Sequence, residues 1–175
     1  MVYKVALVGH SQLPDIEDYD DVEFEQFKRS GARITTFTEG HDFNRICSNE
    51  WDCVIIFLGG NDLCDHHDAS LMVRDLLDFV SKIQAQTIFV TEVEKRFYNR
   101  DLEIQHNTTT QQYMRLATIA NNQLRRRAKA KTFRLIHLPS SYNLNSRDGG
   151  IHFGDLAVRS LISKYIGNIN RVCNE

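Results

Sequence analysis

The sequence lacks the long apolar runs and the strong charge bias that mark membrane proteins and polyanion binders. None of its apolar runs approaches the roughly 20 residues that a helix needs to span a bilayer. Met1 leads almost directly into a predicted strand, with no basic segment or signal core before it. The formal net charge is −2, too near neutral for a general nucleic-acid or membrane-surface binder. We therefore expect a soluble, cytoplasmic protein whose partners bind at local sites.

Cysteine is scarce and has no metal-ligand spacing. The four cysteines, Cys47, Cys53, Cys64 and Cys173, include no C-x-x-C pair, and two of them lie in or beside apolar segments. This distribution favours buried free thiols over a disulfide framework or a structural zinc site.

Internal repeats and low-complexity linkers are also absent. A chain of 175 residues with 42% hydrophobic residues is long enough to bury one full core, and it is short for two domains. The sequence therefore predicts a single domain over residues 1–175.

What the sequence does contain is a regular alternation of apolar strands and amphipathic helices. Short runs rich in Val, Ile, Phe and Thr are typical of parallel strands buried on both faces. The predicted strands are residues 3–9, 32–38, 51–60, 87–93 and 132–139. The predicted helices are residues 21–31, 69–86, 109–130 and 155–169. The alternation predicts an α/β fold, a three-layer α/β/α sandwich around a five-stranded parallel sheet, for which 2-1-3-4-5 is a common strand order.

Ser11 comes shortly after the first predicted strand, where a serine is either a turn residue or an exposed nucleophile. A nucleophilic serine needs a base, a group that orients the base, and donors for the oxyanion that develops. Right-handed crossovers bring the loops after parallel strands to one edge of the sheet. We expect Gly40, Asn61 and His152 to meet Ser11 at that edge. The Ser11 amide, the Gly40 amide and the Asn61 side chain are then candidate oxyanion donors, and His152 is the candidate base.

Four motifs, in this order along the chain, resemble those of the SGNH, or GDSL-type, hydrolases. Gly-His-Ser at residues 9–11 resembles the first block, usually Gly-Asp-Ser, and Gly-Gly-Asn-Asp at residues 59–62 matches the Gly-x-Asn-Asp block. Gly40 lies where the family places its oxyanion-hole glycine, and residues 148–153 resemble the final Asp-x-x-His block. The resemblance extends over nearly the whole chain.

The resemblance implies hydrolysis of a small or short-chain acyl ester without a metal or an organic cofactor. It assigns Ser11 as the nucleophile and His152 as the base. The Ser11 and Gly40 amides and the Asn61 amide side chain would form the oxyanion hole. His10 replaces the usual aspartate, which implies altered local hydrogen bonding and reduced activity rather than a lost mechanism.

The acidic member of the triad departs from the family pattern. Gly149, not an aspartate, stands three residues before His152, and Asp148 is one position too early. The flexible pair Gly149 and Gly150 can absorb the extra residue, so that Asp148 orients the imidazole. The alternative is a Ser-His dyad in which a backbone carbonyl orients the ring. We favour Asp148.

Three further segments have functional hypotheses of their own. Residues 64–68 combine metal-ligand types, but adjacent histidines fit no zinc pattern, and Asp68 is better explained as a helix cap. Residues 96–98, Arg-Phe-Tyr, follow the fourth predicted strand and are candidates for shaping the pocket. The acidic residues between 15 and 21 would disfavour anionic substrates if they border the pocket.

A second hypothesis is a catalytically weakened SGNH-like binding or assembly module. Such domains occur in proteins encoded by some retroelements, and a basic helix end would suit nucleic acid there. The basic residues are Arg125, Arg126, Arg127, Lys129 and Lys131. Their more usual role is to complement the helix dipole while solvated.

Overall fold

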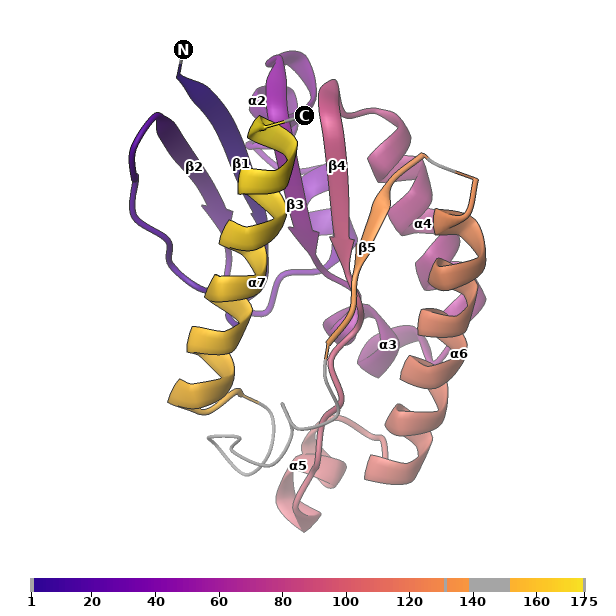
Figure 1. Ribbon diagram of the computed structural model, residues 1–175. Helices are drawn as coiled ribbons and strands as arrows, with labels where there is room; N and C mark the ends of the chain where they lie inside the picture. The colour runs from indigo at the N-terminus through magenta and orange to yellow at the C-terminus, as the bar shows by residue number, and fades with distance from the viewer. Residues whose placement is uncertain (1, 131, 139–151, 175) are drawn as a thin grey trace.

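The computed structural model describes residues 2–130, 132–138 and 152–174, and it contains one five-stranded parallel sheet (Figure 1). The strand order is β2-β1-β3-β4-β5, as predicted. The strands are β1 (Tyr3–Gly9), β2 (Val22–Lys28), β3 (Trp51–Phe57), β4 (Ala85–Thr91) and β5 (Arg134–Ile136). Every adjacent pair runs parallel, which confirms the predicted fold class.

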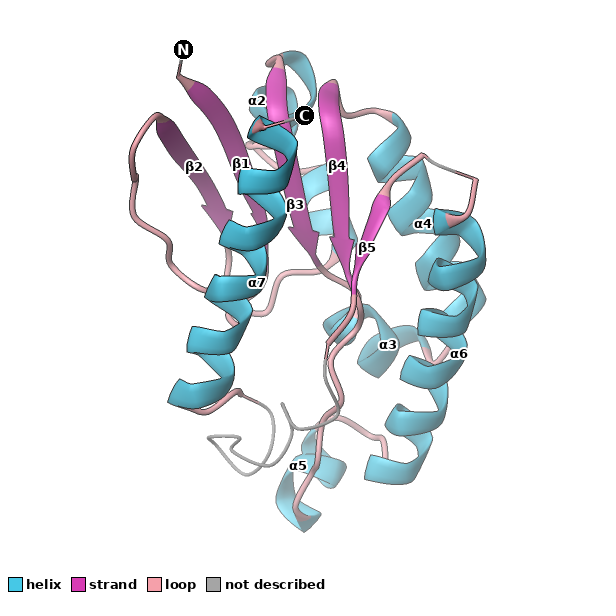
Figure 2. Cartoon of the chain, viewed as in Figure 1, coloured by secondary structure: helices cyan, strands magenta, loops and turns pink. Residues whose placement is uncertain are grey.

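Helices cover both faces of the sheet (Figure 2). They are α1 (Ile34–Thr38), α2 (Phe43–Ser48), α3 (Gly60–His66), α4 (Ala69–Ser81), α5 (Arg100–Gln105), α6 (Thr110–Ala128) and α7 (Asp155–Cys173). Successive residues of a strand point to opposite faces, so Val5 and Leu7 pack toward α7 while Ala6 and Val8 pack toward α4 and α6. The described residues include no helix long and apolar enough to cross a membrane.

The second strand lies earlier in the chain than the sequence predicted. Residues 21–31, expected as a helix, contain β2, and residues 32–38, expected as a strand, contain α1. In β2 the buried Val22 belongs to the core on the α7 side and the buried Phe27 to the core on the other side. In α1 the buried residues are Ile34 and Phe37, at helical spacing. An edge strand that exposes Glu23 and Gln26 has a weak strand signal, which explains the error.

The other predicted elements differ mainly in length. The helix predicted over residues 69–86 ends at Ser81, and Ala85 already begins β4. The predicted fifth strand is reduced to Arg134–Ile136. The carboxyl ends of the strands converge on one edge of the sheet, where α3, α5 and the N-terminus of α7 also lie (Figure 1). The site should therefore be sought at this edge.

Candidate active site

Ser11 and His152 are in contact at the carboxyl edge of the sheet. Ser11 Oγ lies 2.9 Å from His152 Nε2, although 141 positions separate the two residues in the chain. Ser11 follows the end of β1, and His152 lies shortly before α7, which begins at Asp155. An imidazole nitrogen at this distance can accept the hydroxyl proton, which is what a serine nucleophile requires.

The end of β1 packs too closely against β3 for any side chain at Gly9. A Cβ added to Gly9 would lie 2.8 Å from the carbonyl oxygen of Phe57, its neighbour in the sheet register. The turn that follows is closed by a 2.9 Å hydrogen bond from the Leu13 amide to the His10 carbonyl. This turn presents the partly buried Ser11 at the edge.

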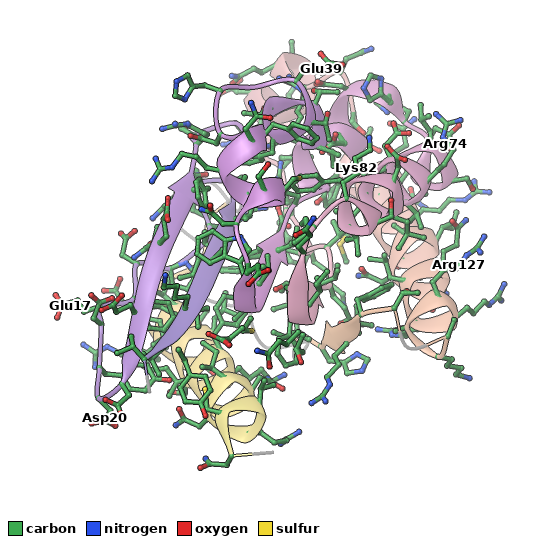
Figure 3. The ribbon with its side chains drawn as sticks, turned by 90° about the horizontal axis from the view of Figure 1, so that it is seen from above. Glu17, Asp20, Glu39, Arg74, Lys82 and Arg127 are labelled. Carbon is green, nitrogen blue, oxygen red and sulfur yellow. The ribbon has the colours of Figure 1, made fainter. Side chains whose placement is uncertain are left out.

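A small open cleft of about 390 Å³ contains Ser11 and His152 in its wall. Phe153 adds an apolar surface, and an ion pair of 2.9 Å between Lys28 and Asp15 borders it. Asp15 is therefore the member of the acidic stretch that lines the cleft. Glu17 and Asp20 lie at the outer edge of the molecule beside β2 (Figure 3).

Asn61 links the loop after β3 to the loop after β2. Its Nδ2 donates to the carbonyl of Ala32 at 2.9 Å, and its Oδ1 accepts from Arg96 Nη1 at 3.0 Å. A carboxamide has two N–H donors, so the Ala32 bond leaves one of them for a ligand. Because Phe57 pairs with Gly9, Asn61 and Ser11 emerge from adjacent strand ends.

Asp62 makes a second link between the same loops. Its buried carboxylate accepts a hydrogen bond of 3.1 Å from the Ile34 amide at the start of α1. Burial raises the pKa of this carboxyl, while the Ile34 hydrogen bond acts in the opposite direction. Asp62 therefore holds the site loops together rather than facing the cleft.

Gly40 does not directly follow the second strand, which ends at Lys28. Gly40 follows α1, and a Cβ there would collide with the carbonyl oxygen of Thr36, so local packing accounts for the glycine. Its neighbour Glu39 lies at the edge of the molecule opposite α7 (Figure 3). The expectation that Gly40 directly follows the second strand is therefore wrong, and its role in the oxyanion hole stays a prediction.

Gly31 is the glycine that follows β2, and the sequence reasoning missed it because it placed this segment in a helix. Gly31 has a φ of +67°, in the left-handed region that favours glycine. The preceding Arg29 amide donates to the Gly9 carbonyl at 3.1 Å, and the following Ala32 carbonyl accepts from Asn61. Gly31 is therefore flanked by contacts to the other two site loops.

The orientation of His152 is not decided by the described residues. Asp148, Gly149 and Gly150 lie outside them. Both the Asp148 triad and the dyad with a backbone carbonyl therefore remain predictions.

His10, the residue that replaces the usual aspartate, is completely buried. Its Nδ1 accepts a hydrogen bond of 3.2 Å from the Gln12 amide, so the ring proton is assigned to Nε2. Nε2 faces Glu94 Oε2 at 3.5 Å. The histidine therefore packs behind Ser11 against a carboxylate.

Glu94 and Arg96 form a buried ion pair beneath the site, and the sequence analysis missed its burial. Glu94 is 1% and Arg96 2% exposed, and Arg96 Nε donates to Glu94 Oε1 at 2.8 Å. Burial alone would raise the pKa of Glu94, but Arg96 and His10 outweigh it and hold that pKa well below its ordinary value.

Tyr98 is also buried, so of the three residues predicted to shape the pocket only Phe97, 43% exposed, reaches the surface. Consecutive charged residues after a strand give no sequence signal for such burial.

Asp68 caps α4, as predicted. Its carboxylate accepts hydrogen bonds from the amides of Ser70 at 2.9 Å and Leu71 at 3.0 Å. The thiol of Cys64 is buried 2.9 Å from the Tyr98 hydroxyl, and burial raises its pKa. Among the described residues no three ligating side chains are grouped to hold a metal ion.

The basic residues at the end of α6 lie away from Ser11. Arg127 is at the surface (Figure 3), and Arg125 donates to the buried carboxylate of Glu92 at 2.8 Å. Arg125 and Lys129 line a larger open cleft of about 840 Å³ beside β5. Lys131 lies outside the described residues. Nucleic-acid binding at this end of α6 stays a prediction.

Comparison with known proteins identifies the fold. No known sequence family matches the chain, and no curated protein matches it either. Among solved structures, the aryl esterase of M. smegmatis is similar, with a TM-score of 0.70 and 14% identity over 98% of this chain and 100% of that one. A lipase/acylhydrolase from Enterococcus faecalis superposes with a TM-score of 0.67 and 13% identity, over 96% of this chain and 95% of its own. A GDSL-like lipase from Bacteroides thetaiotaomicron gives 0.68 and 14%, over 96% and 88%.

These similarities extend over the full fold, and their low identity limits what they say to the fold itself. The chain has the three-layer α/β/α fold of the SGNH, or GDSL-type, hydrolases. The hydrolase fold expected from the four sequence motifs is thereby confirmed.

Proposed function

We propose that this protein is a serine hydrolase that cleaves small or short-chain acyl esters. The observation that supports it most directly is the 2.9 Å separation between Ser11 Oγ and His152 Nε2 at the carboxyl edge of the sheet. A serine that only caps a turn needs no imidazole at its hydroxyl.

In the proposed cycle Ser11 Oγ attacks the ester carbonyl while His152 Nε2 takes the hydroxyl proton. The tetrahedral intermediate collapses as His152 returns that proton to the leaving alcohol, which leaves an acyl group on Ser11. His152 then deprotonates a water molecule that attacks the acyl-enzyme, and it gives this proton to Ser11 Oγ as the bond between Oγ and the acyl carbon breaks and the acid is released.

The oxyanion is proposed to rest on the Ser11 amide and on the second N–H of Asn61. The geometry favours the Gly31 amide over the Gly40 amide as a third donor, because Gly31 lies between contacts to the loops after β1 and β3. A donor directed at the developing negative charge typically contributes about 10²-fold or more in kcat.

The cleft favours a short acyl group. Its volume of about 390 Å³ is at the small end for ligand sites, and its wall combines Phe153 with the Lys28–Asp15 pair. We expect p-nitrophenyl acetate to be hydrolysed faster than long-chain p-nitrophenyl esters.

The test is hydrolysis of p-nitrophenyl acetate together with labelling by a fluorophosphonate probe. Ser11→Ala should abolish both, because it removes the nucleophile while leaving the turn intact. His152→Ala should lower both by about 10³-fold or more, since the hydroxyl loses its base. Ser81→Ala, an exposed serine at the end of α4, is the matched control and should behave like the parent protein. Undiminished turnover by Ser11→Ala would refute the proposal.

A further inference from the structure

The ion pair of Glu94 and Arg96 contacts both loops of the candidate active site. It follows β4, the strand adjacent to β3 on the side away from β1. Its position in the interior is stabilised by Tyr113, whose ring lies 5.4 Å from the Arg96 guanidinium carbon and whose hydroxyl donates to the Glu94 carbonyl at 3.0 Å. The contacts of Tyr113 therefore hold the ion pair from the side of α6, and they form without a bound substrate.

Toward the Ser11 turn, Glu94 contacts the residues on both sides of the serine. Gln12 Nε2 donates to Glu94 Oε1 at 3.2 Å, and His10 Nε2 faces Glu94 Oε2 at 3.5 Å. The two carboxylate oxygens thus divide between the two neighbours of Ser11. Their contacts restrain the turn without touching the serine hydroxyl.

On the side of the loop after β3, Arg96 contacts two consecutive residues, Gly60 and Asn61. Its Nη1 donates to Asn61 Oδ1 at 3.0 Å, which orients the amide so that Nδ2 is directed at the Ala32 carbonyl. A Cβ on Gly60 would overlap both Glu94 Oε1 and Arg96 Nη2, so the pair also fills the space that the glycine leaves. The loop after β3 therefore takes its position from the ion pair.

A buried ion pair is a costly way to fill an interior, because both charges lose their hydration. An arginine offers something that an apolar side chain does not, namely several donors in a rigid plane with fixed directions. Here Nε and Nη2 are directed at Glu94 while Nη1 is directed at Asn61. One guanidinium thus fixes the angle between the carboxylate behind Ser11 and the amide of Asn61.

We propose that Glu94 and Arg96 are positioning residues that align the Asn61 amide with Ser11. This inference rests on the proposed esterase function, in which Asn61 stabilises the oxyanion. Neither residue touches substrate, and each acts through the loop that it holds.

The test is a double-mutant cycle between Arg96→Lys and Asn61→Ala. A lysine keeps the charge for Glu94 but has a single nitrogen, so we expect it to release Asn61 Oδ1. Arg96→Lys should lower kcat for p-nitrophenyl acetate by about tenfold or more with KM within about twofold, as for a loss felt in the transition state. In the Asn61→Ala background the same change should cost less than about twofold, because its target is gone.

The matched control is Arg100→Lys, an exposed arginine at the start of α5, which should leave kcat and KM unchanged. Far-UV circular dichroism and the Tm report whether each variant folds. If Arg96→Lys does not fold, the paired variant Glu94→Gln/Arg96→Met replaces it, because it leaves no lone buried charge. That variant should show the same loss of kcat at unchanged KM. The proposal would be overturned if the losses of kcat caused by Arg96→Lys and by Asn61→Ala multiply in the double variant. It would also be overturned if Arg96→Lys keeps the parental kcat.

A second measurement separates this inference from the proposed function. In the ¹⁵N spectrum the side-chain NH₂ signal of Asn61, assigned by its absence in Asn61→Ala, should shift in Arg96→Lys and stay in place in Arg100→Lys. A parent protein that neither hydrolyses esters nor labels at Ser11 would refute the esterase function. The Asn61 signal would then still decide the positioning role, and an unmoved signal would overturn it.

Discussion

Gly60 is the residue at which the loop after β3, which holds Asn61, packs against the buried ion pair of Glu94 and Arg96. The absence of a side chain lets Glu94 and Arg96 pack directly against the start of α3. The packing of the site therefore depends on the absence of a side chain at Gly60 as much as on the side chains of Glu94 and Arg96. His10 contributes in the opposite way, because its ring is present, is fully buried and directs Nε2 at Glu94.

Gly60→Ala should destabilise the fold and impair hydrolysis together. The added Cβ must displace Glu94 or Arg96, and overpacking of this kind costs about 1–3 kcal/mol. Urea unfolding measures the free energy, and hydrolysis of p-nitrophenyl acetate measures the effect on the site. The control is Gly167→Ala in α7, where a Cβ meets nothing within 4 Å and should add about 0.5–1 kcal/mol of stability. Equal stabilities for the two variants would contradict the packing argument.

Among the elements, the loops after β1, β2 and β3 are fastened to one another before any substrate binds. The Arg29 amide bonds to the Gly9 carbonyl, Asn61 bonds to Ala32, and Asp62 bonds to Ile34. Helix α3 is only seven residues long, and the longer helix α4 follows it almost directly. The three site loops are therefore held together by these hydrogen bonds rather than by α3 alone.

The start of α4 offers a test of this element. Asp68→Ala removes the acceptor for two helix amides and should lower the free energy of unfolding by about 1 kcal/mol. Asp68→Asn keeps an oxygen acceptor at the same place and should recover most of that loss. Chemical denaturation of the three proteins checks the order, and a stability of Asp68→Ala equal to the parent would contradict the cap.

Over the whole molecule, the buried carboxylate of Glu94 couples folding to pH. Its pKa in the folded protein lies well below the ordinary 4.5, because Arg96 and His10 outweigh its burial. A carboxyl with a depressed pKa stabilises the fold fully above its unfolded pKa, and that contribution is lost as the pH falls through and below this value. Glu94 therefore stabilises the fold at neutral pH and makes it sensitive to acid, because this stabilisation is lost as the carboxylate is protonated.

We expect the free energy of unfolding to fall as the pH drops below about 4.5, and to fall less steeply in Glu94→Gln/Arg96→Met. The double variant leaves neither charge alone in the interior. Glu17→Gln, on the exposed loop beside β2, is the control and should keep the parental slope. Denaturant titrations at a series of pH values give these slopes. Identical slopes for the parent and the double variant would exclude Glu94 as a source of acid sensitivity.

Most of the fold could be predicted because buried parallel strands have a local apolar signature. β1, β3 and β4 satisfy it, and β2 does not, because as an edge strand it exposes Glu23 and Gln26. The predicted strand order was nevertheless right, although the described residues between β1 and β2 form no helix, because it was taken from the common doubly wound order and does not depend on where the second strand begins. Because the second strand was predicted too late in the chain, the sequence analysis chose Gly40 as the glycine after this strand, whereas Gly31 is the glycine that follows β2.

The sequence by itself determined the α/β class and the loops that bring Ser11, Asn61 and His152 to one edge. These follow from local hydrophobic patterns and from the handedness of crossovers, which act within short stretches of chain. Only the tertiary structure decided the 2.9 Å contact across 141 positions, the position of Gly31 after β2 and the burial of Glu94 and Arg96. The physical reason is that burial and hydrogen-bond direction depend on which distant side chains pack together, and a charged residue has the same local sequence signal in the core as on the surface.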